Sequence, residues 1–253
     1  MQNRWNDAAA AALDGLDLLV YASRLVGADT SLVVWGGGNT SIKTVERDHR
    51  GREQRVLRVK GSGSDLKSIR RQDFPGVRMD DVLALLERDD MGDQEMVDYL
   101  RFALQEPGGS RPSIETLLHG FLPAQAVIHT HADAIVSLTN NDQAEQVLRE
   151  VYGDSVAALH YRRPAFRISR EVADLLRARP GLRAILLEKH GTITWGASVK
   201  EAYQGTVELI GRAEEAIAHR APGRCHRARA RGPGGVPRGN RPQLRGQRPS
   251  LAR

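Results

Sequence analysis

Two histidines separated by one residue, His129 and His131, end an apolar run that begins at Ala126. Val127 and Ile128 in this run favour a β-strand. Residues two apart on a strand share a face, so both imidazoles are predicted to point the same way and to be close enough to hold one metal ion. Histidine nitrogens are common zinc ligands, and catalytic zinc sites keep one position open for substrate.

A third histidine and a carboxylate extend this candidate site. His190 follows the apolar run 182–187, and Glu115 lies two residues after Ser113 at a predicted helix start. The pattern leaves simpler interpretations open, because a His-x-His pair also arises by chance and the helix dipole favours a first-turn carboxylate whatever its function. His119, four residues after Glu115, is interpreted as structural.

The surrounding pattern predicts the elements that must position these residues. Alternating or continuous apolar runs predict strands, and periodic leucine, valine and alanine residues predict helices. Strands are expected on both sides of a glycine turn within 31–43, and at 54–60, 126–130, 156–159, 182–187 and around 193–195; helices are expected at 7–26, 80–88, 93–104, after Ser113, and at 133–139, 144–151, 171–179 and 198–218.

Two glycine-rich loops also carry polar residues. The first joins Gly36–Gly38 to Asn39–Ser41, and the second is Gly61–Ser64, directly after a predicted strand. Glycine and small hydroxyl residues can cradle a phosphate through backbone N–H groups. A plain turn explains each loop equally well or better by itself, and neither has the glycine spacing of a Rossmann or P-loop motif.

Composition sets the broad class. The chain has 253 residues, 40% of them hydrophobic, and Cys225 is its one cysteine. We therefore expect one or two globular domains without a disulfide framework, in a reducing compartment. No signal peptide and no apolar run of membrane-spanning length is recognised, so a cytoplasmic protein without a membrane partner is predicted.

The positive net charge comes from the end of the chain. Residues 222–253 contain nine arginines, no lysine and no acidic residue, so removing them changes the net charge from +6 to −3 for residues 1–221. This Arg/Pro/Gly-rich tail is expected to be disordered. Nucleic-acid binding by the tail is the less favoured hypothesis; a shifted reading frame in GC-rich DNA is another, which the genomic DNA would test.

Taken together, the motifs from Asp7 to Ala218 resemble the class II aldolase/adducin family. The resemblance rests on the order and separation of five motifs: Gly38-Asn39-Thr40-Ser41, Gly61-Ser62-Gly63, Pro112-Ser113-Ile114-Glu115, His129-Thr130-His131 and His190-Gly191. The residues around these motifs are most similar to the aldolase half of bifunctional rhamnulose-1-phosphate aldolase/short-chain alcohol dehydrogenase proteins. No glycine-rich dinucleotide motif follows Ala218, so a dehydrogenase half is not expected in this chain.

The resemblance implies a fold and a set of roles. Residues 1–221 would form a three-layer α/β/α domain with a mostly antiparallel central sheet, assembled into a homo-oligomer, commonly a tetramer. His129, His131 and His190 would bind one Zn²⁺ per subunit and Glu115 would be the catalytic acid/base. Substrate phosphate would be bound by Asn39, Ser62, Gly63 and Ser113.

The function implied is a zinc-dependent aldolase acting on a small sugar phosphate. It would cleave a ketose 1-phosphate, with L-rhamnulose 1-phosphate the first expectation, to dihydroxyacetone phosphate and lactaldehyde. The alternatives are a sugar-phosphate 4-epimerase, another metal-dependent lyase, or a non-catalytic adducin-like binding module. Many family aldolases carry two serines before the glutamate, whereas the second position here is Ile114, and a tyrosine that some members supply near the C-terminus has no counterpart.

Overall fold

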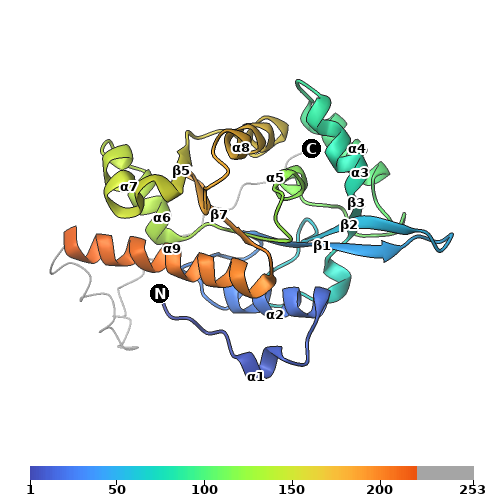
Figure 1. Cartoon of the computed structure of the whole chain (residues 1–253), viewed down its shortest axis with the longest axis horizontal. Coiled ribbons are helices and arrows are strands. Elements are labelled where there is room, and N and C mark those ends of the chain that lie inside the picture. Colours follow the sequence, from blue (N-terminus) through green and yellow to red (C-terminus); the bar gives the residue numbers. More distant parts are fainter. Residues whose placement is uncertain (221–253) are drawn as a thin grey trace, which may run out of the picture.

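A mixed seven-stranded sheet, in the order β3-β2-β1-β4-β7-β6-β5, forms the centre of the molecule (Figure 1). The computed structural model describes residues 1–220. The strands are β1 (Asn39–Arg47), β2 (Glu53–Val59), β3 (Gly76–Arg78), β4 (Ala126–Thr130), β5 (Val156–Leu159), β6 (Ala184–Leu187) and β7 (Gly191–Gly196). Neighbouring strands are antiparallel except β5 and β6, which confirms the predicted α/β fold with a mostly antiparallel sheet.

Helices cover both faces of the sheet (Figure 1). They are α1 (Asp7–Ala10), α2 (Gly15–Gly27), α3 (Met79–Ala84), α4 (Asp93–Phe102), α5 (Thr116–Phe121), α6 (Asp133–Thr139), α7 (Ala144–Tyr152), α8 (Phe166–Ala178) and α9 (Val199–Arg220). Helices α2, α6, α7 and α9 pack on one face, and α3, α4, α5 and α8 contribute to the cores on the other. Within residues 1–220, no helix has the length and apolar character needed to cross a membrane.

Strand β4 connects the two cores because its side chains alternate between the faces. Ile128 packs in the core with α2 and α9, whereas Val127 packs in the core with α5 and α8. His129, two residues after Val127, therefore lies on the α5 face. The N-terminus of α5 is where the chain places Glu115, so the period-two pattern brings these two residues to the same side of the sheet.

Some predicted boundaries were wrong. The expected helix 7–26 is broken into α1 and α2, because Asp14 is extended and Gly15 has a φ of 45°, which an α-helix does not allow. The helix predicted to start at Ser113 begins later, at Thr116, with Glu115 in the cap position. Helix α8 begins at Phe166, five residues before the predicted start at 171.

The expected strand before the first glycine turn is absent from the described sheet. Val34 and Trp35 are 65% and 80% exposed, so this apolar pair is not part of the core. Gly36 and Gly38 have positive φ angles of 75° and 66°, and these angles fold the segment into a turn. The predicted tail, residues 222–253, lies outside the described residues, and the domain boundary at residue 221 remains a prediction.

Candidate metal centre

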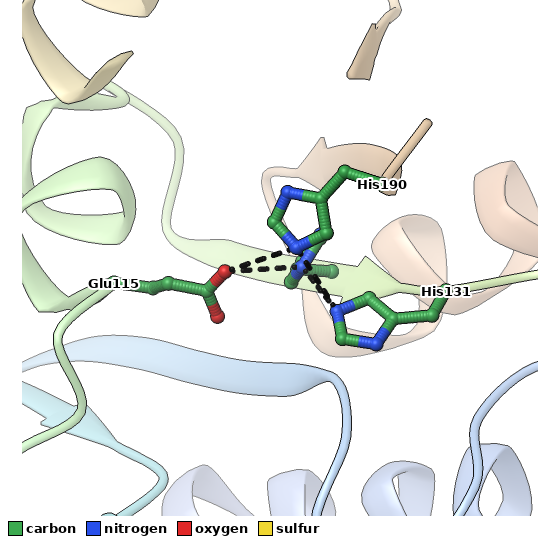
Figure 2. Close-up of side chains that lie close together, drawn as sticks. Glu115, His131 and His190 are labelled. Carbon is green, nitrogen blue, oxygen red and sulfur yellow. Dashed lines mark hydrogen bonds and ion pairs between the residues drawn. The ribbon is translucent and has the colours of Figure 1, made fainter. Parts of the chain in front are cut away.

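Three imidazoles and one carboxylate from distant parts of the chain meet at one end of β4. His131 Nε2 lies 3.0 Å from His129 Nε2 and 3.2 Å from His190 Nε2. Glu115 Oε1 lies 3.3 Å from His129 Nε2 and 3.5 Å from His190 Nε2. The four potential ligand atoms all lie within 4.8 Å of one another. Figure 2 shows Glu115, His131 and His190 pointing toward a common centre.

The turn between β6 and β7 positions His190. Its backbone N–H donates to the Leu187 carbonyl oxygen at 3.1 Å, which closes the turn. Lys189 has a φ of 57°, a left-handed conformation that is uncommon for a residue with a Cβ. Gly191 then lets β7 approach β4, because a Cβ at that position would lie 2.0 Å from the Thr130 carbonyl oxygen. The histidine is thus placed by a constrained backbone rather than by side-chain packing alone.

A backbone carbonyl sets the orientation of the His129 ring. His129 Nδ1 lies 3.0 Å from the Thr192 carbonyl oxygen on the neighbouring strand β7. A carbonyl oxygen only accepts hydrogen bonds, so Nδ1 carries the proton that it donates. When the ring is neutral, its Nε2 atom presents a lone pair to the other site residues. This arrangement is typical of histidine ligands to metals.

The donor set fits a divalent cation. A ring nitrogen carries at most one proton, so His131 Nε2 can donate to only one of its two histidine neighbours. Bound metal would satisfy all three nitrogens, and the ligands of a tetrahedral Zn²⁺ lie roughly 3.3 Å apart. Burial, together with the charge of His129, lowers the pKa of His131 and of His190 to about 4. Both rings are therefore neutral near pH 7, the form that binds metal.

Glu115 stays ionised although its side chain is largely buried. Burial alone would raise the pKa of this carboxyl, but the neighbouring His129, with His190 and His119 further away, holds the pKa well below its usual range. The same pairing acts in reverse on His129, where burial opposes the charge and the Glu115 carboxylate raises the pKa. The two groups form a coupled acid/base pair at the edge of the centre.

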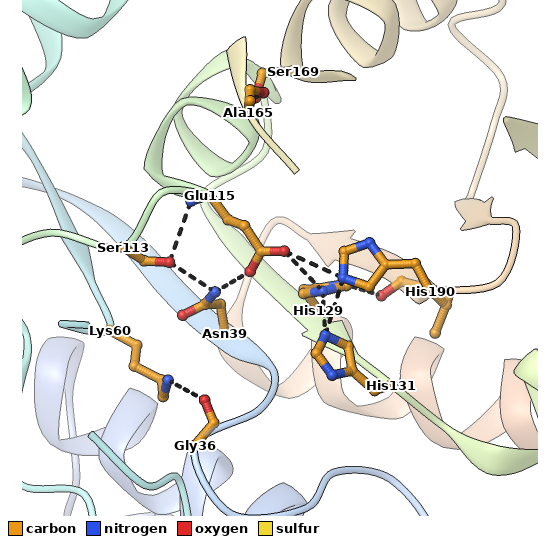
Figure 3. A network of polar contacts seen from close by, with 11 residues as sticks. Gly36, Asn39, Lys60, Ser113, Glu115, His129, His131, Ala165, Ser169 and His190 are labelled. Atoms are coloured by element: carbon orange, nitrogen blue, oxygen red, sulfur yellow. Dashed lines mark hydrogen bonds and ion pairs between the residues drawn. The ribbon is translucent and has the colours of Figure 1, made fainter. Parts of the chain in front are cut away.

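The residues predicted to bind phosphate lie at the start of β1 and on two adjoining loops. The Asn39 side-chain amide donates to Ser113 Oγ at 3.1 Å and also to Glu115 (Figure 3). Ser62 and Gly63 lie in an exposed loop that is tied to the segment before Ser113, because the Ser62 N–H donates to the Arg111 carbonyl oxygen at 2.8 Å. Asn39 therefore contacts the Glu115 carboxylate directly, Ser113 accepts from the Asn39 amide and from the Glu115 backbone N–H, and Ser62 and Gly63 lie on the neighbouring loop.

Sequence reasoning missed a buried cation beside the centre. Lys60 is 3% exposed, and its ammonium donates to the Gly36 carbonyl oxygen at 3.1 Å (Figure 3). Burial lowers the pKa of Lys60, while the charges of Glu115 and Asp65 act in the opposite direction. A lysine that ends an otherwise alternating strand directly before a glycine loop was the available signal.

His119 takes no part in the four-residue cluster. Its ring is fully buried, and Nδ1 lies 2.8 Å from Ser41 Oγ. Burial lowers the pKa of His119 to about 3, so the ring is neutral near pH 7. This environment agrees with the structural role predicted for it.

Comparison with known proteins identifies the family. The sequence profile described as "Class II Aldolase and Adducin N-terminal domain" matches residues 17–217. The chain belongs to the class II aldolase/adducin family. The three histidines and Glu115 all lie within the matched range, as do both glycine loops. The predicted family is thus confirmed, and the metal dependence of class II aldolases agrees with the His/Glu cluster.

Relatives of this class II aldolase/adducin chain include whole proteins and single domains. It is similar to the N-terminal class II aldolase domain of a conserved protein from Thermoplasma acidophilum, with a TM-score of 0.80, 46% identity, and coverage of 86% of this chain and 99% of that chain. A Bacillus subtilis (strain 168) protein named "Uncharacterized oxidoreductase YuxG" is 45% identical over 214 residues, which are 84% of this chain and 31% of that protein. The chain thus spans about a third of this relative.

Two further relatives have named activities. Methylthioribulose-1-phosphate dehydratase of Pseudomonas fluorescens (strain Pf0-1) is 34% identical over 116 residues, which are 38% of this chain and 55% of that protein. L-fuculose-1-phosphate aldolase from Thermus thermophilus has a TM-score of 0.54 at 20% identity, over 81% of this chain and 97% of that chain. At this identity the second likeness concerns the fold alone.

Proposed function

We propose that this chain is a zinc-dependent aldolase that cleaves a ketose 1-phosphate, with L-rhamnulose 1-phosphate as its first candidate substrate. The products would be dihydroxyacetone phosphate and lactaldehyde. The observation that carries the proposal is the convergence of His129, His131 and His190 with Glu115. A cation held by three neutral imidazoles keeps its full charge, and carbon–carbon cleavage next to a ketone needs such a charge.

The metal, when bound, supplies a Lewis acid that offsets the negative charge developing on the substrate carbonyl oxygen. His129, His131 and His190 hold it there, and the Thr192 carbonyl keeps the His129 ring in the required orientation. No lysine Schiff base is then required. Burial of the ligands keeps water from screening their interactions with charge.

Glu115 would move the proton in this reaction. Its carboxylate is ionised, lies at the edge of the centre and is held by Asn39 through the second carboxylate oxygen. An ionised carboxylate can take a proton from the substrate hydroxyl whose C–O bond becomes the aldehyde, or return a proton to the carbon left behind. Which of these transfers Glu115 performs depends on how far it moves from the position that Figure 3 shows.

Phosphate binding would orient the substrate at this centre. Asn39, Ser62, Gly63 and Ser113 are the groups we assign to the phosphate, so binding energy distant from the reacting bond fixes the geometry of that bond. Gly63 has a φ of 85°, and no atom lies within 4 Å of the place where a Cβ would stand. This open backbone leaves space for a ligand to approach.

A different metal-dependent lyase is the second candidate. The 34% identity to a methylthioribulose-1-phosphate dehydratase favours removal of water from a sugar phosphate on the same centre. A 4-epimerase would also use the same ligands, and an adducin-like binding module would need none of them. The proposal further includes a cytoplasmic homo-oligomer, in which a tetramer is the expected size, with a sugar phosphate rather than nucleic acid as partner.

The test is a product assay on purified, zinc-loaded protein. A panel of ketose 1-phosphates, including L-rhamnulose 1-phosphate and methylthioribulose 1-phosphate, separates the candidates, because an aldolase releases dihydroxyacetone phosphate and an aldehyde, whereas a dehydratase releases water and keeps the carbon chain. Metal analysis should give about one Zn²⁺ per chain. Protein that contains no stoichiometric divalent metal, or that cleaves none of the panel, would contradict the aldolase assignment.

A further inference from the structure

Arg111 lies beside the glycine loop and has no role in the metal centre. We propose that Arg111 is a substrate-recognition residue that supplies the positive charge for the phosphate group held at the loop of Ser62 and Gly63. The inference rests on the proposed function and adds the residue that would make the site selective for a phosphorylated sugar.

Two contacts fix Arg111 against this loop. Its guanidinium donates through Nη2 to Ser62 Oγ at 3.1 Å, and its carbonyl oxygen accepts from the Ser62 N–H at 2.8 Å. A further β-bridge joins Gly61 to Pro112, so the two loops run antiparallel at this point. The arginine side chain is thus held at the same loop that was predicted from sequence to bind phosphate.

The neighbouring Ser62 and Ser113 hydroxyls could donate hydrogen bonds to a ligand, but they carry no charge. Ser62 Oγ accepts from Arg111, and Ser113 Oγ accepts from the Asn39 amide and from the Glu115 N–H. Each hydroxyl is therefore used as an acceptor, and within residues 1–220 neither hydroxyl proton has an acceptor of its own. Free, oriented O–H donors suit the oxygens of an anion.

A cation among these donors would offset the charge of a phosphate dianion. Lys60 does not suit this role, because it is buried and its ammonium is bonded to the Gly36 carbonyl. Arg111 is exposed, and among the described residues it forms no ion pair with a carboxylate. Its planar guanidinium presents two parallel N–H donors that match two phosphate oxygens, a geometry that an ammonium lacks.

Ile114 leaves this site without a hydrogen-bond donor that a serine would supply. Its side chain stands between Ser113 and Glu115 and is 41% exposed, without any hydrogen-bonding group. A hydroxyl at this position would add one more donor to the phosphate group. With an isoleucine there, a charge-assisted bond from Arg111 makes up for the missing donor, because such bonds are roughly twice as strong as neutral ones.

The experiment compares Arg111→Gln and Arg111→Lys with the wild-type zinc-loaded protein. The matched control is Arg149→Gln, an exposed arginine on α7 whose partner is Glu145. For the ketose 1-phosphate that the enzyme turns over, Arg111→Gln should raise KM by about tenfold or more and leave kcat within about twofold. Arg111→Lys should recover part of the loss, and KM for the unphosphorylated ketose should stay unchanged in every variant.

A second measurement keeps this inference separate from the aldolase assignment. Inorganic phosphate is titrated into each zinc-loaded protein by calorimetry, which needs no turnover. Weaker phosphate binding in Arg111→Gln than in wild type and Arg149→Gln supports the inference even if no substrate of the panel is cleaved. Equal phosphate affinity in all three proteins, or an equal rise of KM for the phosphorylated and unphosphorylated ketose, would overturn it.

Discussion

His129 donates through Nδ1 to the Thr192 carbonyl oxygen 3.0 Å away, and this bond determines which ring nitrogen faces the metal centre. The bond spans two neighbouring strands, so the sheet itself orients the ligand. An outer-shell contact of this kind is worth about 10–100-fold in metal affinity. Loss of a histidine that binds the metal itself should lower metal affinity by more than loss of this contact does.

Removal of one ligand histidine should therefore abolish tight metal binding. We expect His129→Ala, His131→Ala and His190→Ala each to weaken zinc binding by more than about 100-fold, a loss at least as large as that of an outer-shell contact. Competition with a chromogenic chelator measures the affinity. The control is His160→Ala, because the His160 side chain is 94% exposed and, within residues 1–220, pairs only with Glu188. A ligand variant that binds zinc as tightly as His160→Ala would exclude that histidine from the centre.

Asn39 should act on catalysis through Glu115 rather than through the metal. Its amide donates to the carboxylate, so Asn39→Asp places a second negative charge against Glu115. Like charges at this distance raise the pKa of a carboxyl. We expect the acid limb of the pH profile of kcat/KM to move to higher pH in Asn39→Asp.

Zinc content separates this effect from damage to the centre. It should be unchanged in Asn39→Asp and in the uncharged variant Asn39→Ala. Asn39→Ala removes one hydrogen bond to the Glu115 carboxylate but adds no charge, so it should move the acid limb less than Asn39→Asp does. If both variants shift the limb equally, or if both lose zinc, then Asn39 does not act through the charge of Glu115.

The sequence predicted the residues of the centre because their side chains carry the signal. Period-two alternation in β4 put His129 on one face, and the apolar run before His190 indicated a second strand end. The three histidines that the structure brings together could thus be grouped before their distances were known, and their role as metal ligands stays a prediction. What could not be predicted was their support, since the Thr192 contact to His129 is made by a backbone carbonyl, which no residue type reveals.

The same limit explains the errors in the fold. Val34 and Trp35 are apolar and β-prone, yet Gly36 and Gly38 turn the chain before it can join the sheet. Local propensity is overridden there by backbone geometry. The buried position of Lys60 was likewise invisible, because its partner is the Gly36 carbonyl and not an acidic side chain.

Lys43 should make the free energy of unfolding depend on pH in the alkaline range. Its ammonium donates to the carbonyl oxygens of His119 and Ala124, and burial lowers the pKa of Lys43 from 10.5 to about 8. Between these two values the unfolded state binds more protons than the folded state, so the free energy of unfolding should rise with pH across this window. The gain is at most about 3 kcal/mol.

Urea unfolding between pH 8 and 10 measures this contribution. Lys43→Met should lose the rise with pH, whereas the control Lys67→Met, at an exposed lysine, should follow the wild type. Parallel stability curves for wild type and Lys43→Met would show that Lys43 has nearly the same pKa in the folded and unfolded states.

Two glycines should respond in opposite directions to the same substitution. In Gly191→Ala the new Cβ would stand 2.0 Å from the Thr130 carbonyl oxygen, so β4 and β7 would have to separate beside His190. In Gly205→Ala, within α9, the Cβ meets nothing within 4 Å, and alanine is preferred to glycine in a helix by about 0.5–1 kcal/mol. We expect Gly205→Ala to raise the free energy of unfolding by about that amount with zinc affinity unchanged. Gly191→Ala should lower both the free energy of unfolding and the zinc affinity, because the strand contact that it breaks also holds the turn of His190. A Gly191→Ala protein with wild-type stability and zinc affinity would show that this close approach does not position His190.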